Sequence, residues 1–272
     1  MTALTMESFS YVSDLVRRES AIVLEAGKEY LVESRLGPVS RSAGLGDVNE
    51  LVATLRSRPN ATLAKAVVEA LTTNETSFFR DAEPFNALRT TVLPELARTR
   101  PTRSIRVWSA ACSSGQESYS IAMTIRDTPE VAGFRTEIVG TDLSEEMVER
   151  SRAGRYSQLE VNRGLPATTL VKNFTRAGAH WQIAPDLAAM TSFRTLNLMR
   201  PFVGLGRLDI VFVRNVLIYF DVPTKADILR RIRQTMAPDG FLFLGAAETP
   251  MGVDDGWERM SVGRQAIYRP AR

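Results

Sequence analysis

Residues 106–120 read RVWSAACSSGQESYS and decide the fold of the chain. The apolar run at 105–108 is typical of a short buried strand. Small residues follow from 109 to 114, and Gly115 closes the loop. Apolar side chains then recur at helical spacing over 116–125. The stretch therefore predicts the first strand, loop and helix of a doubly wound α/β sheet, in which ligands lie at the carboxyl ends of the strands.

A second strand and helix support the first pair. Residues 137–142 are an apolar run that ends in Asp142, and Ser144 can cap the helix that follows. Asp142 lies roughly 25 residues beyond the loop, close to the ~20 at which an acid reaches the ribose of an adenosine ligand. Only Gly115 stands where a dinucleotide enzyme has G-x-G-x-x-G, so a pyrophosphate has less room. These units favour S-adenosylmethionine, but a nucleotide-dependent oxidoreductase stays open because the fold hosts many functions.

Composition and charge limit the classes of function. With 44% hydrophobic and 24% charged residues among 272, the chain can build an ordinary globular core. A formal net charge of +3 gives no reason to expect nucleic-acid binding. No apolar run approaches the ~18 residues of a membrane span, and no signal sequence is recognisable. Cys112 and His180 are the single cysteine and histidine, which excludes an internal disulfide, fits a reducing cytoplasm and argues against a metal site.

The chain before the sheet predicts a small all-helical N-terminal domain over 1–80. This region contains no good strand, and Asp47 and Asn60 can each cap a helix. The helix that precedes Asp47 is expected to end near Gly37-Pro38 or at Gly44, because proline and glycine both interrupt helices.

Basic side chains are scattered over these helices and interleaved with glutamates. The pattern alone favours solvated helix faces. The alternative is a basic surface that meets an acidic partner helix, formed by Arg17, Arg18, Lys28, Arg35, Arg41, Arg56 and Arg58.

The remainder predicts a linker helix and linker at 81–101 and an α/β domain at 102–272. Residues 155–192 lose the alternation of strand and helix and predict a small antiparallel β insertion. Short runs at 181–183 and 190–193 are its candidate strands. A final antiparallel hairpin is typical of the class I methyltransferase form of this Rossmann-like sheet, whose later strands we expect at 193–198, 208–213, 241–245 and 264–268.

Several stretches together resemble the chemotaxis receptor methyltransferase family, CheR. They occur in the order of the family and cover nearly the whole chain, at 73–80, 113–120, 140–142, 197–198 and 214–220. One departure follows the loop glycine, where the family usually has two acids and then proline. This chain has Gln116, Glu117 and Ser118, so the second acid, which contacts the cofactor in the family, is kept.

The resemblance implies an enzyme that transfers the methyl group of S-adenosylmethionine to glutamate side chains of chemoreceptors. The products are glutamyl methyl esters and S-adenosylhomocysteine, and the role is adaptation in chemotaxis-type signalling. A glutamate carboxylate is already ionised near neutral pH, so it can attack the sulfonium methyl without a general base. The cofactor contacts that the resemblance implies are Asn74, Thr76, Arg80, Glu117, Asp142, Asn197, Leu198, Asn215 and Val216.

Two residues are candidates for a catalytic role. Arg80 can orient a carboxylate, either that of the cofactor or that of the substrate. Tyr219 either faces the reacting centre or is a core aromatic residue. Cys112 is expected to be a small packing residue rather than a nucleophile, and His180 a surface residue of the insertion.

The partner implied is the set of cytoplasmic receptor helices that carry the methylated glutamates. Some family members dock a peptide at the C-terminus of the receptor on the antiparallel insertion, but the turn within 174–181 is shorter here, so tail-peptide docking is not expected. Lys28, Arg35 and Arg41 are the candidates to meet the acidic receptor helices directly. The alternative function is a non-catalytic adaptor of a chemosensory system that binds S-adenosylmethionine.

Overall fold

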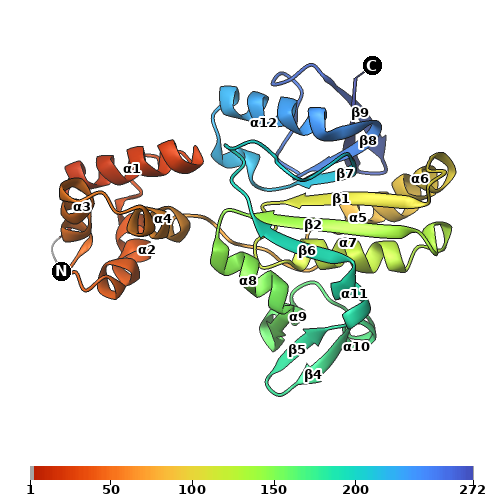
Figure 1. The fold of residues 1–272 in the computed structure, drawn as a ribbon, viewed down its shortest axis with the longest axis horizontal. Helices are drawn as coiled ribbons and strands as arrows, with labels where there is room; N and C mark the ends of the chain where they lie inside the picture. Colours follow the sequence, from red (N-terminus) through yellow and green to blue (C-terminus); the bar gives the residue numbers. More distant parts are fainter. Residues whose placement is uncertain (1–2, 272) are drawn as a thin grey trace. The chain divides into compact units, whose positions relative to one another are not determined.

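Four helices build the N-terminal unit of the computed structural model, which describes residues 3–271 (Figure 1). This unit runs to Thr73 and also includes the segment Tyr219–Thr224. Its apolar side chains meet between the helices, and those of Val12, Leu51 and Val67 are fully buried. The helices are α1 (Met6–Ser20), α2 (Glu29–Ser42), α3 (Val48–Ser57) and α4 (Ala61–Ala70).

Side-chain caps fix where these helices begin. The carboxylate of Asp47 accepts a hydrogen bond from the amide of Glu50 at the start of α3, at 3.0 Å. The side chain of Asn60 accepts one from the amide of Leu63 at the start of α4, also at 3.0 Å. Both predicted caps are confirmed. Each satisfies a backbone donor that the first turn of a helix leaves unpaired.

The second unit, Asn74–Ile218 with Lys225 onward, is built on a seven-stranded sheet. Its order is β6-β2-β1-β7-β8-β10-β9, in which the first five strands are parallel to their neighbours and β10 is antiparallel to both β8 and β9. This confirms the predicted class I methyltransferase sheet with its antiparallel final hairpin. The strands are β1 (Ser104–Ala110), β2 (Arg135–Asp142), β6 (Thr191–Thr195), β7 (Leu208–Val213), β8 (Met236–Leu244), β9 (Trp257–Val262) and β10 (Gln265–Pro270).

Helices pack along this sheet and close its core. The central strands are apolar on both sides, and Val107, Ile210 and Phe241 are fully buried, as expected for a sheet covered on both faces. No helix of residues 3–271 is long and apolar enough to cross a membrane. The helices and helical turns here are α5 (Glu83–Ala87), η1 (Leu88–Val92), α6 (Leu93–Thr99), α7 (Gln116–Arg126), η2 (Pro129–Val131), α8 (Glu145–Ala153), η3 (Leu217–Tyr219) and α12 (Val222–Thr235).

A small antiparallel sheet is inserted between α8 and β6, which confirms the predicted β insertion. Its order is β3-β5-β4. The expectation that 190–193 supply one of its strands is wrong, because this run opens β6 and pairs in parallel with β2 of the main sheet. The insertion contains β3 (Arg155–Ser157), α9 (Gln158–Asn162), α10 (Ala167–Asn173), β4 (Phe174–Ala177), β5 (His180–Ile183) and α11 (Pro185–Ala189).

The predicted domain limits at 80 and 101 stay predictions. The two units of the structure meet in sequence between Thr73 and Asn74. Two ends were predicted for α2. The one at Gly37-Pro38 is wrong, since this helix runs through Pro38 to Ser42. The alternative at Gly44 agrees with the structure, because this glycine follows the helix in a left-handed conformation at φ 75°.

Candidate functional site

The loop after β1 lies at the carboxyl edge of the parallel strands. Its backbone is tightly turned, because Ala111, Ser113 and Gly115 all have positive φ, at 54°, 50° and 92°. A Cβ at Gly115 would lie 2.9 Å from the hydroxyl of Ser151 on α8, so only glycine fits there. The amide of Cys112 donates to the carbonyl of Thr141 at 2.9 Å. The loop is therefore pressed against β2 and α8, and its small side chains leave the backbone accessible to a ligand.

Asp142 ends β2 beside this loop and is only 6% exposed. One carboxylate oxygen accepts from the amide of Ser113 at 2.7 Å, and the other from the amide of Ser144 at 3.0 Å. Asp142 thus ties the loop after β1 to the start of α8. A carboxylate has about four lone-pair sites, so it can accept from hydroxyl groups of a ribose as well as from amides.

Glu117 stands in the first turn of α7, where the helix dipole favours an acid. One oxygen accepts from the hydroxyl of Ser109 at 2.7 Å, and the other from Nη1 of Arg214 at 3.0 Å. Its carboxylate is therefore held in place by β1 on one side and by the residue after β7 on the other.

The segment from Asn74 to Arg80 lies against the same loop. The carbonyl of Asn74 accepts from the hydroxyl of Ser113 at 2.7 Å, and Nη1 of Arg80 donates to the carbonyl of Glu75 at 3.1 Å. Phe78 is fully buried and packs edge-on against Tyr156 and Phe174. Thr76 is partly buried within this segment. The buried phenylalanine anchors the segment that presents Asn74, Thr76 and Arg80.

Asn197 and Leu198 follow β6, at the same edge of the sheet. The amide of Leu196 donates to the carbonyl of Asp142 at 2.9 Å, which brings this loop beside β2. The side-chain oxygen of Asn197 accepts from the amide of Met199 at 2.9 Å, and Leu198 is buried. The turn thus places an amide side chain and an apolar one next to Asp142.

Asn215 and Val216 follow β7, and Asn215 has a left-handed backbone at φ 58°. Their amides donate to the carboxylate of Glu248 at 2.8 and 2.9 Å. The structure therefore brings all the predicted cofactor residues to the carboxyl edge of strands β1, β2, β6 and β7 or to the Asn74–Arg80 segment that lies against it.

Comparisons with known proteins agree with this arrangement. The family model for the all-alpha domain of CheR methyltransferases matches residues 7–72, and the model for their S-adenosylmethionine-binding domain matches residues 74–266. The chain belongs to the CheR methyltransferase family. It is 40% identical over 259 residues to the chemotaxis protein methyltransferase Cher2 of Pseudomonas putida, covering 93% of this chain and 94% of the relative.

Two further CheR relatives extend the match. Chemotaxis protein methyltransferase 1 of Pseudomonas aeruginosa is 41% identical, with 93% of this chain and 94% of the relative covered. The chemotaxis protein methyltransferase of Escherichia coli is 38% identical, with 98% of this chain and 91% of the relative covered. The cofactor is therefore S-adenosylmethionine, and the oxidoreductase alternative is set aside.

The residues at the carboxyl edge fit this cofactor. The loop around Gly115 offers backbone and small side chains but no glycine-rich cradle for a pyrophosphate. Asp142 brings carboxylate oxygens, which accept from hydroxyl groups, and Asn197 and Asn215 bring side-chain amides with both donors and acceptors. These are the groups that an adenosine with an amino-acid tail requires.

Sequence reasoning missed Glu248, which is 8% exposed and lies in the turn after β8. Its carboxylate accepts from five backbone amides, those of Asn215, Val216, Leu217 and Ile218, and that of Gly245 at 2.7 Å. A Cβ at Gly245 would lie 2.6 Å from this carboxylate, so the glycine makes the approach possible. A single acid after a strand carries no pattern that predicts such a role.

Sequence reasoning also missed Arg214, whose side chain is 2% exposed. In the sequence, Arg214 is one residue of the motif at 214–220. Nothing in that motif indicates that its guanidinium is buried between the carboxylates of Asp81 and Glu117.

Tyr219 lies in the segment that folds with the N-terminal unit. Its carbonyl accepts from the amide of Val23 at 3.2 Å, and its side chain is partly buried. Its catalytic role stays a prediction.

The remaining candidates have structural environments. Cys112 is buried in the loop after β1, and burial raises the pKa of its thiol well above the ordinary value, so it is not a thiolate nucleophile at neutral pH. His180 is exposed on β5 of the small sheet. Within residues 3–271, no three His, Cys, Asp or Glu side chains gather to hold a metal ion.

Proposed function

We propose that this CheR family member transfers the methyl group of S-adenosylmethionine to glutamate side chains of chemoreceptors. The products are glutamyl methyl esters and S-adenosylhomocysteine, and the reaction serves adaptation in a chemotaxis-type pathway. The observation that supports this most is that four polar residues meet at a single edge of the sheet. Glu117 lies in the first turn of α7, Asp142 ends β2, and Asn197 and Asn215 follow β6 and β7. The printed names of the relatives, chemotaxis protein methyltransferases, support the receptor as substrate.

Methyl transfer to a carboxylate requires little acid–base catalysis by side chains of the protein. The bound cofactor supplies a sulfonium-activated methyl group. The attacking glutamate carboxylate has an ordinary pKa of about 4.3 and is ionised at neutral pH. The chain therefore contributes mainly by holding carboxylate oxygen, methyl carbon and sulfur in line, which removes much of the entropic part of the barrier.

Each polar residue has a role within this proposal. Asp142 accepts hydrogen bonds from the ribose hydroxyl groups, and Glu117 accepts from the amino group of the cofactor's methionine part. Asn197 and Asn215 bind the adenine edge and the amino-acid end. Arg80 orients a carboxylate, and Asn74, Thr76, Leu198 and Val216 line the same site.

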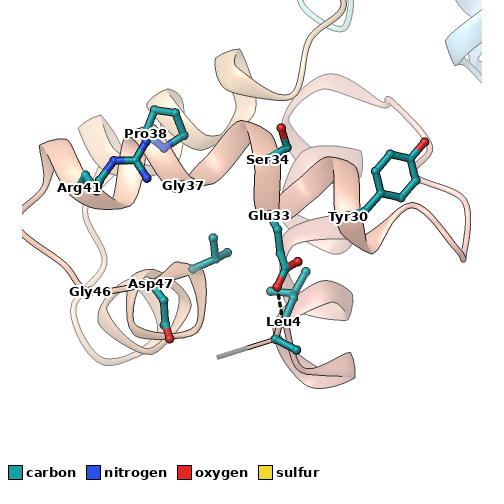
Figure 2. Close-up of a pocket in the computed structure, with 11 residues that line it drawn as sticks. Leu4, Tyr30, Glu33, Ser34, Gly37, Pro38, Arg41, Gly46 and Asp47 are labelled. Atoms are coloured by element: carbon teal, nitrogen blue, oxygen red, sulfur yellow. Dashed lines mark hydrogen bonds between the residues drawn. The ribbon is translucent and has the colours of Figure 1, made fainter. Parts of the chain in front are cut away.

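Receptor recognition is proposed for the N-terminal unit. Arg41 is exposed and lines a cavity of about 560 Å³ between α2 and the start of α3; Figure 2 shows it at one end of a row of α2 residues that has Tyr30 at the other. Lys28 is partly buried and pairs with Glu25 at 2.9 Å. Both can offer positive charge to acidic receptor helices, with a strength that falls as salt rises.

Arg35 is a weaker candidate than the sequence suggested. Its Nη1 donates to the carbonyls of Leu71 and Thr72, at 3.0 and 2.7 Å. These carbonyls follow the end of α4, so Arg35 closes that helix within its own unit. We therefore assign receptor contact to Lys28 and Arg41 ahead of Arg35.

Docking of a receptor tail peptide is not part of this proposal. The hairpin of β4 and β5 has a two-residue turn, since Ala177 pairs with His180. The strand β4 at the edge is four residues long, which leaves a short row of main-chain groups for an added strand.

Because the receptor helices that carry the glutamates are cytoplasmic, we also propose the cytoplasm as the site of action.

A non-catalytic adaptor is the alternative, and two assays separate it. Calorimetry with S-adenosylhomocysteine tests cofactor binding, which both functions require. Methyl transfer to receptor fragments tests turnover, which only the enzyme shows. Binding without transfer would favour the adaptor.

A further inference from the structure

Arg214 is a buried charge at the carboxyl end of β7. Removing a guanidinium from water costs several kcal/mol, and buried ion pairs often fail to repay that cost in stability. Nε of Arg214 is buried and, among the described residues, has no hydrogen-bond partner. A well-packed apolar side chain of similar volume would often stabilise the fold as much as this ion pair does. We therefore expect the buried charge of Arg214 to have a role other than stabilising the fold.

The contacts of Arg214 connect three segments of the site. Nη1 donates to Glu117 at 3.0 Å, at the start of α7. Nη2 donates to the carboxylate of Asp81 at 2.7 Å and to the carbonyl of Arg80 at 2.9 Å. Asn215 follows Arg214 directly in the chain. The rigid, planar guanidinium group of Arg214 thus connects the three segments that carry Arg80, Glu117 and Asn215.

The turn that carries Arg80 needs such a support. Phe79, Asp81 and Ala82 all have positive φ, at 48°, 67° and 40°, a region that residues with a Cβ rarely adopt. The amide of Phe79 donates to the hydroxyl of Ser120 at 2.9 Å, which fixes the turn on its first side. Arg214 fixes it on the other side by holding Asp81 and the carbonyl of Arg80 itself.

We propose that Arg214 is a positioning residue for Arg80: its guanidinium, held between Glu117 and Asp81, keeps the turn at Phe79–Ala82 in the one conformation that presents Arg80 to the reaction site. This inference rests on the proposed methyl transfer and adds a residue to it. It predicts that the Arg214–Asp81 pair influences the reaction through Arg80 and not through the stability of the sheet.

A matched ion pair at the opposite end of the sheet supplies the control. Arg100 bonds to Asp239 through both Nη atoms, at 2.6 and 2.9 Å, and to Asp209 at 2.6 Å. Asp239 and Asp81 are similarly exposed, with side-chain exposures of 48% and 45%, and each pairs with a largely buried arginine. Asp81→Asn and Asp239→Asn therefore make the same chemical change at the two ends.

The test measures kcat and KM for methyl transfer to a receptor fragment by the full chain, together with the affinity for S-adenosylhomocysteine. We expect Asp81→Asn to lower kcat/KM by about tenfold, the effect of one hydrogen bond to a charged group. Asp239→Asn should stay within about twofold of the wild type, since its pair lies away from the site. Arg214→Lys keeps the charge but loses the planar guanidinium that bonds to several acceptors at once. It should lower kcat at least as much as Asp81→Asn.

Coupling to Arg80 decides the proposal. In an Arg80→Ala background, Asp81→Asn should change kcat/KM by less than about twofold, because its effect passes through the missing side chain. A tenfold loss that persists in this background would overturn the proposal, as would equal effects of Asp81→Asn and Asp239→Asn. If Arg214→Lys does not fold, the two aspartate variants and the comparison in the Arg80→Ala background still test the proposal. A wild-type chain that binds S-adenosylhomocysteine but methylates no receptor contradicts the proposed function instead.

Discussion

At the scale of single residues, the polar side chains of the site have structural bonds as well as predicted ligand contacts. Asp142 accepts from two backbone amides, and Glu117 accepts from Ser109 and Arg214. Such bonds fix each acceptor before the cofactor arrives, which reduces the entropy lost on binding. They also mean that a substitution here affects the fold and the site together, so each test needs a measure of both.

Asp142→Ala should weaken the binding of S-adenosylhomocysteine by about 1.5–3 kcal/mol, the value of hydrogen bonds to a charged group. It should also lower the melting temperature, because the amides of Ser113 and Ser144 lose their acceptor. Asp142→Asn keeps an acceptor oxygen and should be milder in both respects. Calorimetry and thermal unfolding measure the two effects. Unchanged affinity in Asp142→Ala would remove this residue from the site.

Arg80→Ala should lose methyl transfer while the fold is retained. Within residues 3–271, the side chain of Arg80 hydrogen-bonds to the carbonyl of Glu75, whereas the nearby Phe78 carries the packing. We expect a fall in kcat/KM of at least about tenfold, corresponding to the loss of one charge-assisted contact. Circular dichroism and thermal unfolding confirm that the fold is intact. Normal turnover in a folded variant would contradict the role carried over from the family.

At the scale of elements, the turns after the strands determine where the site residues lie. Glu248 is the clearest case, because one carboxylate in the turn after β8 gathers five amides, four of them from the turn after β7. The two neighbouring parallel strands are thereby tied together at the edge where ligands bind.

Glu248→Gln should test this tie. Glutamine has a single acceptor oxygen, so several of the five amides lose their partner, each at a cost of about 1–3 kcal/mol. We expect a lower melting temperature and weaker binding of S-adenosylhomocysteine, since Asn215 and Val216 lie in the released turn. Glu258→Gln, at an exposed position of β9, makes the same change of charge and is the control. A variant with wild-type stability and affinity would show that the tie is dispensable.

The elements themselves were predictable where the pattern was periodic, and the turns were not. The strand before Ser109, the strand ending in Asp142 and the caps at Asp47 and Asn60 follow from apolar runs and cap chemistry. The run at 190–193 is ambiguous in sequence, since only its pairing partner makes it part of the main sheet.

Two other features depend on tertiary packing and on partners distant in sequence. Pro38 normally ends a helix, but here α2 continues through it, with Leu36 and Ser40 buried on either side of it. Tertiary packing has outweighed the local preference. Arg214 bonds to Glu117, and Glu248 to Asn215, across more than 30 residues of sequence, and no local pattern encodes such a partner.

At the scale of the whole molecule, the proposal divides recognition and chemistry between the two units. The N-terminal unit carries the cations Lys28 and Arg41, of which Arg41 is exposed, and the second unit carries the predicted cofactor residues. In this proposal, a receptor helix that is rich in glutamates is attracted to the first unit by charge and methylated by the second. Such attraction acts mainly on the encounter and is screened over about 8–10 Å at physiological ionic strength.

Charge reversal in the N-terminal unit should therefore slow receptor methylation and spare cofactor binding. We expect Lys28→Glu with Arg41→Glu to raise KM for the receptor fragment severalfold at low salt, and the difference from wild type to shrink as salt rises. Arg35→Glu should instead lower stability, because it loses the carbonyls of Leu71 and Thr72. A double variant, Lys28→Glu with Arg41→Glu, that methylates receptors normally at low salt would rule out this surface.

Submicromolar binding of a receptor tail peptide to the protein would overturn the expectation that recognition is direct. The measurement is calorimetric titration of the peptide, with a scrambled peptide as control. We expect no binding in this range, because β4 is a short edge.

The central claim is methyl transfer to receptor glutamates, and one measurement tests it most directly. A cytoplasmic receptor fragment is incubated with the protein and S-adenosylmethionine, and its peptides are analysed by mass spectrometry alongside the S-adenosylhomocysteine formed. The account predicts methyl esters on glutamate side chains, removed by mild base, with one S-adenosylhomocysteine for each ester. A protein that binds S-adenosylhomocysteine but forms no ester on any receptor fragment would contradict it.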